Sequence, residues 1–195
     1  MKPILSAHDK RCINKLIESK LFQRIMTEKL DISNGIIIAP CSDGDQFDDT
    51  YKHIASICNM PTNRIHPVAL NGGAILMGNR LPEEQSGHGD CMFENILKAS
   101  EIKSIKDVFL YGHFPCAIAR ANSLGVVDQG LSLMEAKKRL KEAATDLRIR
   151  CFFHIDMYDE VEGNSHKKRT YFMPKEMWNN EELTLPVLHD YRSGL

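Results

Sequence analysis

The pattern of apolar and polar positions along the chain predicts helices and strands in alternation. Apolar residues recur at helical spacing in four segments: 8–29, 48–59, 90–100 and 132–147. Strands are expected at five segments: 35–39, 64–70, 108–111, 149–158 and 168–173. Ser132 and Glu135 form a capping box in sequence, which predicts the start of the last helix. This alternation indicates an α/β protein rather than an all-helical or all-strand one.

Two of the strand segments, 35–39 and 108–111, are continuous apolar runs. Such runs are typical of central parallel strands that are covered on both faces. The segment 168–173 is expected to return as an antiparallel edge strand, and the tail after Pro174 is expected to be irregular. We therefore predict a mostly parallel β-sheet flanked by helices. Residues 1–34 are expected to form an N-terminal helical arm, and residues 35–195 a single α/β domain.

Composition limits the classes of partner. The 195 residues include 25 basic and 26 acidic side chains, and a net charge of -1 argues against nucleic acid or a membrane surface as a partner. The first residues contain neither a signal peptide nor a membrane span, which favours a cytoplasmic protein. The six cysteines form no Cys-x-x-Cys pair, so they are expected to be reduced, buried or metal-bound rather than disulfide-linked.

Three side chains that bind metals follow the two apolar strands. Cys41 comes after 35–39, and His113 and Cys116 come after 108–111. Gly112 is expected to end the strand and Pro115 to begin a helix, which places Cys116 in the first helical turn, where the dipole favours a thiolate. Ligands bind beyond the carboxyl ends of parallel strands, so these side chains are expected to converge there.

A Cys2His set holds Zn²⁺ with the fourth position open to water, and zinc lowers the pKa of that water to about 7. Asp43 would accept a hydrogen bond from this water. One alternative is that Cys41 and Cys116 are ordinary buried thiols and His113 is a satisfied polar residue. Another is that the second His-x-x-Cys, at 88–91, holds the metal, although Asp90 as a helix cap with a buried Cys91 explains that segment better.

The order of these motifs resembles the β-class carbonic anhydrases. The resemblance covers about 35–125: a Cys-x-Asp motif at Cys41 and Asp43, a glycine-rich turn at 71–74, and the His-x-x-Cys of His113 and Cys116. It implies that Cys41, His113 and Cys116 are the zinc ligands and that Asp43 orients zinc-bound hydroxide. It also implies reversible hydration of carbon dioxide to bicarbonate, and a homodimer or higher oligomer in which the N-terminal helix lies across the neighbour.

The chain departs from the family's Cys-x-Asp-x-Arg motif at the arginine, which is Asp45 here. The resemblance therefore leaves three functions open. The first is carbon dioxide hydration with another cation, from Arg64, Arg80 or Arg120, in place of the arginine. The second is zinc-dependent hydrolysis of another small electrophile, such as carbonyl sulfide or carbon disulfide. The third is a non-catalytic zinc protein in which Asp43 closes the site.

Overall fold

The protein is built on a six-stranded sheet with the order β1-β6-β5-β4-β2-β3. The computed structural model describes residues 5–24, 29–32, 34–59, 64–82, 86–162 and 165–193. The strands are β1 (Gln23–Arg24), β2 (Ile36–Ala39), β3 (Ile65–Pro67), β4 (Asp107–Phe114), β5 (Arg148–Glu162) and β6 (Ser165–Phe172). β3, β2, β4 and β5 pair in parallel, whereas β5 with β6 and β6 with β1 are antiparallel. The predicted α/β class with a mostly parallel sheet is confirmed.

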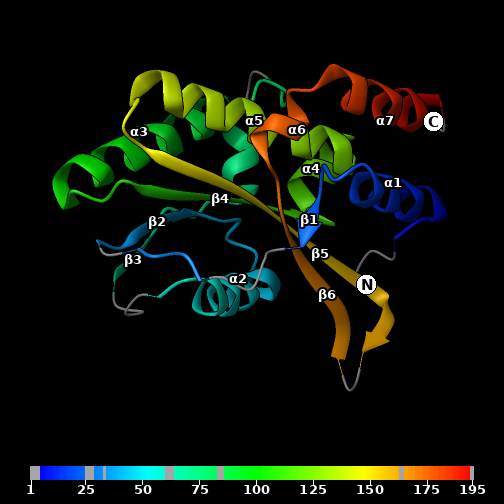
Figure 1. The fold of residues 1–195 in the computed structure, drawn as a ribbon, viewed down its shortest axis with the longest axis horizontal. Coiled ribbons are helices and arrows are strands. Elements are labelled where there is room, and N and C mark those ends of the chain that lie inside the picture. The colour runs from blue at the N-terminus through cyan, green and yellow to red at the C-terminus, as the bar shows by residue number, and fades with distance from the viewer. Residues whose placement is uncertain are drawn as a thin grey trace.

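Helices cover both faces of this sheet (Figure 1). They are α1 (Ala7–Glu18), α2 (Gly44–Ile57), the 3-10 helix η2 (Gly73–Met77), α3 (Ser86–Lys103), α4 (Ala117–Ala121), α5 (Val126–Ala143), α6 (Lys175–Trp178) and α7 (Glu181–Ser193). α2 lies against one face, and α3 and α5 lie against the other. None of the helices in these described ranges is long and apolar enough to cross a membrane.

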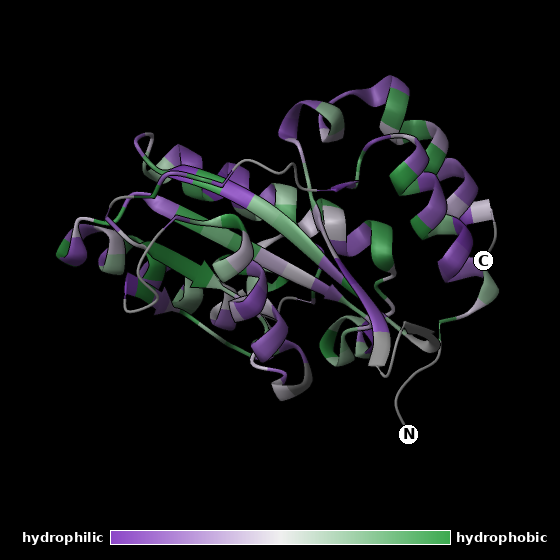
Figure 2. Cartoon of the chain, turned by 60° about the horizontal axis from the view of Figure 1, so that its bottom comes forward, coloured by the Kyte–Doolittle hydropathy of each residue, from purple (hydrophilic) through white to green (hydrophobic). Residues whose placement is uncertain are grey.

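The core has two parts because the sheet separates them. On the α3 and α5 side, alternate residues of β5 (Ile149, Cys151, Phe153, Ile155 and Met157) pack into the larger cluster, as the sequence alternation predicts. On the α2 side, a smaller cluster is formed mainly by Ile38, Phe109, Tyr111 and Phe152. The residues of β2 and β4 are all buried, as expected for central strands. Apolar colour is accordingly concentrated at the centre of the sheet, whereas β6 and the outer helix faces are mostly polar (Figure 2).

The N-terminal helix is shorter than predicted and packs on its own chain. Ser6 caps α1, where its side chain accepts a hydrogen bond from Asp9 N and the Asp9 carboxylate accepts one from Ser6 N. Ile13 and Leu16 are fully buried against α5 and α7. The apolar positions at 25 and 26 lie outside the described residues. The division into an arm (1–34) and a domain (35–195) stays a prediction.

Two elements in the second half of the chain differ from their sequence predictions. β6 is antiparallel to β5, as predicted, but it is not the last strand of the sheet, because Gln23 and Arg24 of β1 pair with its last two residues on the outer side. α5 begins at Val126 rather than Ser132, which is buried within the helix. Gly130 made this start hard to predict, because glycine has a low helix propensity. The fold nevertheless requires glycine at this position, since a Cβ would lie 2.3 Å from the Trp178 ring.

The tail after Pro174 is helical, not irregular. α6 brings Trp178 into the core, where Trp178 Nε1 donates a hydrogen bond to the carbonyl of Leu21 at 2.8 Å. α7 follows and contains Pro186. Proline has no N–H to donate within a helix, so the sequence did not indicate a helix here. An ion pair between Lys15 and Asp190 joins α7 to α1. The first and last described helices therefore pack together.

Leu133→Ala should lower the free energy of unfolding by about 2–5 kcal/mol, because Leu133 is completely buried and its removal leaves a cavity. Urea denaturation of the two proteins measures this difference. Leu185→Ala is the matched control, since Leu185 is 57% exposed and its truncation should change stability by no more than about 0.5 kcal/mol. Equal effects of the two substitutions would contradict the position of α5 in the core.

Candidate metal centre

Cys41 is placed by the sheet and by the glycine turn at 71–74. It follows β2, and its backbone forms an isolated parallel bridge with Leu70 after β3. Gly72 N donates a hydrogen bond to Cys41 Sγ at 3.1 Å. Gly73 has a φ of +62°, and a Cβ at this position would lie 2.4 Å from Cys41 N. Only glycine fits this approach, so the turn and the cysteine are positioned together.

His113 and Cys116 come from the end of β4, with a local geometry that differs from the prediction. β4 continues through Phe114, so Gly112 lies inside the strand rather than ending it. Cys116 is the N-cap residue of α4, and Pro115 precedes this helix instead of beginning it. α4 has only five residues. The backbone N–H groups of Ile118 and Ala119 in this helix lower the pKa of Cys116, but its interaction with Cys41 and its burial outweigh them.

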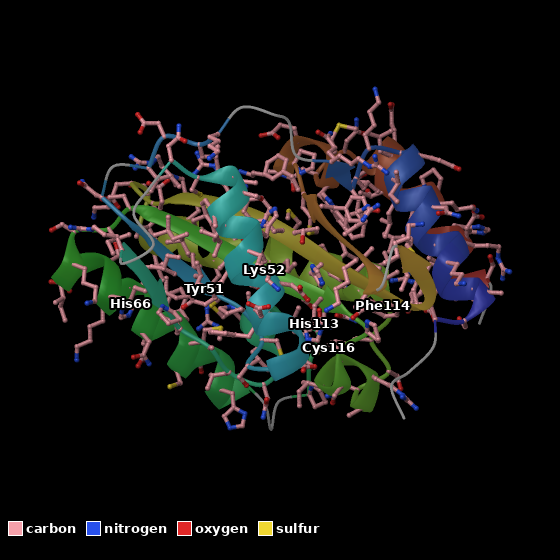
Figure 3. The ribbon with its side chains drawn as sticks, turned by 90° about the horizontal axis from the view of Figure 1, so that it is seen from below. Tyr51, Lys52, His66, His113, Phe114 and Cys116 are labelled. Atoms are coloured by element: carbon pink, nitrogen blue, oxygen red, sulfur yellow. The ribbon has the colours of Figure 1, made fainter. Side chains whose placement is uncertain are left out.

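The structure brings Cys41, His113 and Cys116 together. One ligand atom from each lies within 4.8 Å of the other two. All three side chains are buried, and Figure 3 shows His113 and Cys116 side by side. Within the part of the chain that the structure describes, this is the only group of three or more His, Cys, Asp or Glu side chains that could hold a metal ion. The convergence predicted from the strand ends is therefore present.

The donor set fits a zinc ion. Both ring nitrogens of His113 are buried and make no hydrogen bond of ordinary geometry to a described residue, although the ring lies close enough to Cys41 to lower the pKa of its thiol. Metal coordination would satisfy one of these nitrogens. The hydrogen bond from the Cys116 thiol is the largest of the effects that lower the pKa of Cys41 to about 4. The same hydrogen bond, together with burial, raises the pKa of Cys116. The pair thus holds a buried thiolate beside an imidazole, and two sulfur ligands with one nitrogen suit Zn²⁺.

Asp43 and Asp45 lie at the start of α2. The backbone carbonyl of Asp43 accepts hydrogen bonds from Gln46 N and Phe47 N, so this residue opens the helix. Asp43 is half-buried, and its carboxylate does not belong to the group of converging ligand atoms. Asp45 occupies the first turn of α2, and its side chain lies outside the described part of the structure.

The three arginines considered as replacements for the missing cation lie on other elements. Arg64 donates a hydrogen bond from Nη2 to the carbonyl of Asn34 at 2.8 Å. Arg80 forms ion pairs with Asp128 and Glu135 of α5. Arg120 is exposed on α4. Two of the three therefore have interactions at other places in the fold.

The second His-x-x-Cys motif lies within α3, on the protein surface. α3 begins at Ser86, so Asp90 lies inside the helix and pairs with Arg139 instead of capping it. Cys91 is exposed, whereas the sequence predicted a buried thiol, and His88 is exposed too. These two side chains belong to no group of three or more potential ligands among the described residues.

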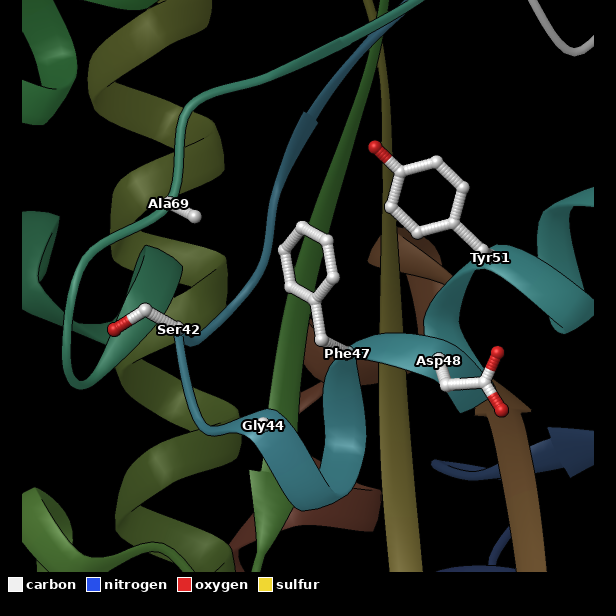
Figure 4. Close-up of a pocket in the computed structure, with 6 residues that line it drawn as sticks. All are labelled: Ser42, Gly44, Phe47, Asp48, Tyr51 and Ala69. Carbon is white, nitrogen blue, oxygen red and sulfur yellow. The ribbon is translucent and has the colours of Figure 1, made fainter.

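A pocket of about 620 Å³ lies beside the loop that carries Cys41. Phe47 and Tyr51 project into it from α2, with ring centroids 5.2 Å apart, and Ser42 and Ala69 lie on the opposite side (Figure 4). Ser42 directly follows Cys41, and its hydroxyl donates a hydrogen bond to Asn71 Oδ1 at 2.7 Å. The sequence showed Tyr51 only as part of an apolar helix face. Its role as a pocket residue depends on how α2 packs.

A buried polar group next to His113 was also missed from the sequence. His154 on β5 pairs in register with His113, and its Nδ1 lies 2.8 Å from Thr170 Oγ1. Its Nε2 is 3.8 Å from an Asp49 oxygen, and Asp49 also pairs with Lys168. Burial lowers the pKa of His154 to about 4, so the ring is neutral at pH 7. The alternation of side chains along β5 could have indicated this position, because it places His154 on the face of the sheet that α2 covers.

No protein-family model and no curated protein matches the sequence. Among solved structures, the chain is similar to the β-carbonic anhydrase CafD of Aspergillus fumigatus, with 14% identity, a TM-score of 0.45, and coverage of 78% of this chain and 99% of that one. The β-carbonic anhydrase CafA of the same fungus is similar at 13% identity and a TM-score of 0.41, over 82% and 84% of the two chains. A carbonic anhydrase from Streptococcus mutans is similar at 11% identity and a TM-score of 0.39, over 78% and 94%. These are similarities of backbone arrangement, and the properties of the site follow from its own residues.

Gly73→Ala should displace Cys41 and lower both stability and metal affinity, because the added Cβ would meet the backbone of Pro40 and Cys41 at 2.4–3.0 Å. We expect a loss of stability of about 1–3 kcal/mol and weaker binding of zinc. Urea denaturation and competition with a zinc chelator measure the two effects. Gly87→Ala in α3 is the control, since nothing lies within 4 Å of a Cβ there. Unchanged zinc affinity in Gly73→Ala would show that the turn does not support the site.

Proposed function

We propose that this protein is a zinc-dependent lyase of the carbonic anhydrase type that hydrates carbon dioxide reversibly to bicarbonate. The observation that carries the proposal is the convergence of Cys41, His113 and Cys116, whose ligand atoms lie within 4.8 Å of one another. The proposal includes a cytoplasmic location, a small-molecule substrate and assembly into a homodimer or higher oligomer.

Zinc held by three protein ligands supplies hydroxide at neutral pH, because it lowers the pKa of a water in the fourth position to about 7. Cys41 and Cys116 would provide the sulfur ligands, and the hydrogen bond from Cys116 lowers the pKa of Cys41, which favours its thiolate form. His113 would provide the nitrogen ligand, using one of two ring nitrogens that make no hydrogen bond of ordinary geometry to a described residue. Gly72 N stabilises the Cys41 sulfur by donating a hydrogen bond to it.

An open site agrees better with the structure than a site closed by aspartate. The group of converging ligand atoms contains two cysteines and a histidine, and no described carboxylate joins it. Asp43 lies two residues from Cys41 at the start of α2, where it can orient a water by accepting its hydrogen bond. We therefore assign Asp43 as the orienting residue and not as a fourth ligand.

The nearby pocket suits a small uncharged substrate. Phe47, Tyr51 and Ala69 give it apolar walls beside the Cys41 loop. Apolar walls favour carbon dioxide over bicarbonate, because bicarbonate would lose hydration there and the lining residues, which include Ser42 and Asp48, offer it no cation. Carbonyl sulfide and carbon disulfide share this lack of charge, so they are the substrates to compare with carbon dioxide.

Cys116→Ser should lower zinc affinity by more than about 100-fold, because loss of a ligand costs more than loss of a residue that only supports one. Its stability should fall as well, since metal binding is coupled to folding. Zinc per chain after dialysis, measured by mass spectrometry, tests this. Cys91→Ser is the matched control and should keep its zinc, because Cys91 is exposed on α3. Zinc loss in Cys91→Ser alone would move the metal site to the second His-x-x-Cys.

Stopped-flow hydration of carbon dioxide tests the activity, on protein whose zinc content has been measured. We expect about one zinc per chain and a kcat that rises between about pH 7 and pH 9, as the water in the fourth position loses its proton. Asp45→Arg should raise the rate by about tenfold or more, because it restores a cation next to the carboxylate that orients the water.

The control for the charge change is Asp146→Arg, which alters an exposed side chain that pairs with Lys106. This substitution should leave the rate unchanged. Full zinc content without turnover in either the original chain or Asp45→Arg would contradict carbon dioxide as the substrate. Carbonyl sulfide and carbon disulfide would then be assayed with the same two proteins.

A further inference from the structure

A basic pocket lies at the other end of the sheet from the candidate metal centre. Its volume is about 440 Å³, and its lining residues are Arg64, Ile65, His66, Lys103 and Ile105. Ile65 and His66 belong to β3, whereas Lys103 is the last residue of α3. Figure 3 shows His66 far from His113 and Cys116. The pocket is therefore separate from the group of metal-binding side chains.

The charges around this pocket are all of one sign. Two cationic side chains and a histidine line it, and no acidic side chain does. Within the described ranges, neither Arg64 nor Lys103 forms a salt bridge, whereas Arg80, Lys106 and Arg139 each form one. Burial, and then the charge of Lys103, lower the pKa of His66, so the pocket disfavours a further positive charge. A bound anion would offset the repulsion between the positive charges in the pocket.

The arginine is held in place before any ligand binds. Arg64 Nη2 donates a hydrogen bond to the carbonyl of Asn34, and the side chain lies against Gly35. Gly35 has a φ of +91°, and a Cβ there would lie 2.9 Å from Arg64 Cβ and 3.3 Å from Arg64 Nε. Glycine is required both for this conformation and for this contact. An arginine that is already ordered loses less side-chain entropy when it binds a ligand.

We propose that this pocket binds a phosphate group, either as inorganic phosphate or as the head of a phosphate monoester. The planar guanidinium of Arg64 matches two phosphate oxygens, and Lys103 adds a second charge from α3. His66 donates a hydrogen bond from the same side. Ile65 and Ile105 complete the lining of the pocket, but Ile105 is only 3% exposed and Ile65 packs against the smaller core cluster.

The phosphate site does not depend on the zinc proposal. Its residues lie at β3 and at the end of α3, and none of them is a candidate metal ligand. Phosphate binding can therefore be measured on the zinc-loaded protein without reference to turnover. Either proposal can fail while the other stands.

The test is a titration of the full-length protein with inorganic phosphate at pH 7.5, followed by NMR of the histidine side chains. His66→Gln identifies the His66 signal. We expect this signal to shift and saturate with a Kd of about 1 mM or tighter, while chloride at the same ionic strength leaves it in place. Equal shifts with phosphate and chloride would show only general screening and would overturn the proposal.

Lys103→Gln should weaken phosphate binding by about tenfold, as expected for loss of a charged contact. Lys103 is exposed, so this variant should fold normally. Lys138→Gln makes the same charge change at an exposed position of α5 and should leave the affinity as it is. Arg64→Lys keeps the charge but loses the paired hydrogen bonds, and it should also weaken binding. Unchanged affinity in both Lys103→Gln and Arg64→Lys would overturn the site.

A comparison of inorganic phosphate with phenyl phosphate separates the two sources of the phosphate group. Tighter binding of phenyl phosphate would assign the pocket to monoesters. Tighter or equal binding of inorganic phosphate would assign it to the free ion. Binding of neither compound would overturn the proposal.

Discussion

The parallel pairing of β2 with β4 is the constraint on which the candidate site depends. Ile36 lies opposite Asp107 and Ala39 opposite Leu110, so the two strands run in the same direction and in a fixed register. Cys41 follows Ala39 by two residues, and His113 follows Leu110 by three. A shift of one residue would turn every side chain to the other face of the sheet and separate these ligands.

The glycine turn at 71–74 further restricts the position of the Cys41 sulfur. The sheet alone brings the strand ends to one edge, but the Gly72 N–H and the close approach of Gly73 determine where the Cys41 sulfur lies. A buried thiolate is costly to form, and the hydrogen bonds from Cys116 and Gly72 offset part of that cost. A metal ion bound by the two cysteines and the histidine would offset more of it.

The face of the sheet that α2 covers changes from apolar to polar along its length. Phe109, Tyr111 and Phe152 form an apolar cluster in the middle, whereas His113 and His154 make the end of the same face polar. The polar end lies next to α2, which also supplies Phe47 and Tyr51 to the pocket beside Cys41. The opposite end of the sheet carries the basic pocket of Arg64, His66 and Lys103. The two ends of one sheet thus present different chemistry, one with sulfur and imidazole ligands and one with cationic groups.

The sequence by itself determined the α/β class, the central strands and the three residues that converge, because continuous apolar runs and strand ends are local features. Tertiary structure decided the rest. Gly130 and Pro186 weaken helix signals, yet both lie in helices, because Trp178 packs against Gly130 and α7 packs against α1. Cys91 was expected to be buried and is exposed, since the spacing of a motif does not show which side of a helix faces the core. The pairing of His154 with His113 and the position of Arg64 against Gly35 join residues far apart in the chain, and only the folded sheet brings them together.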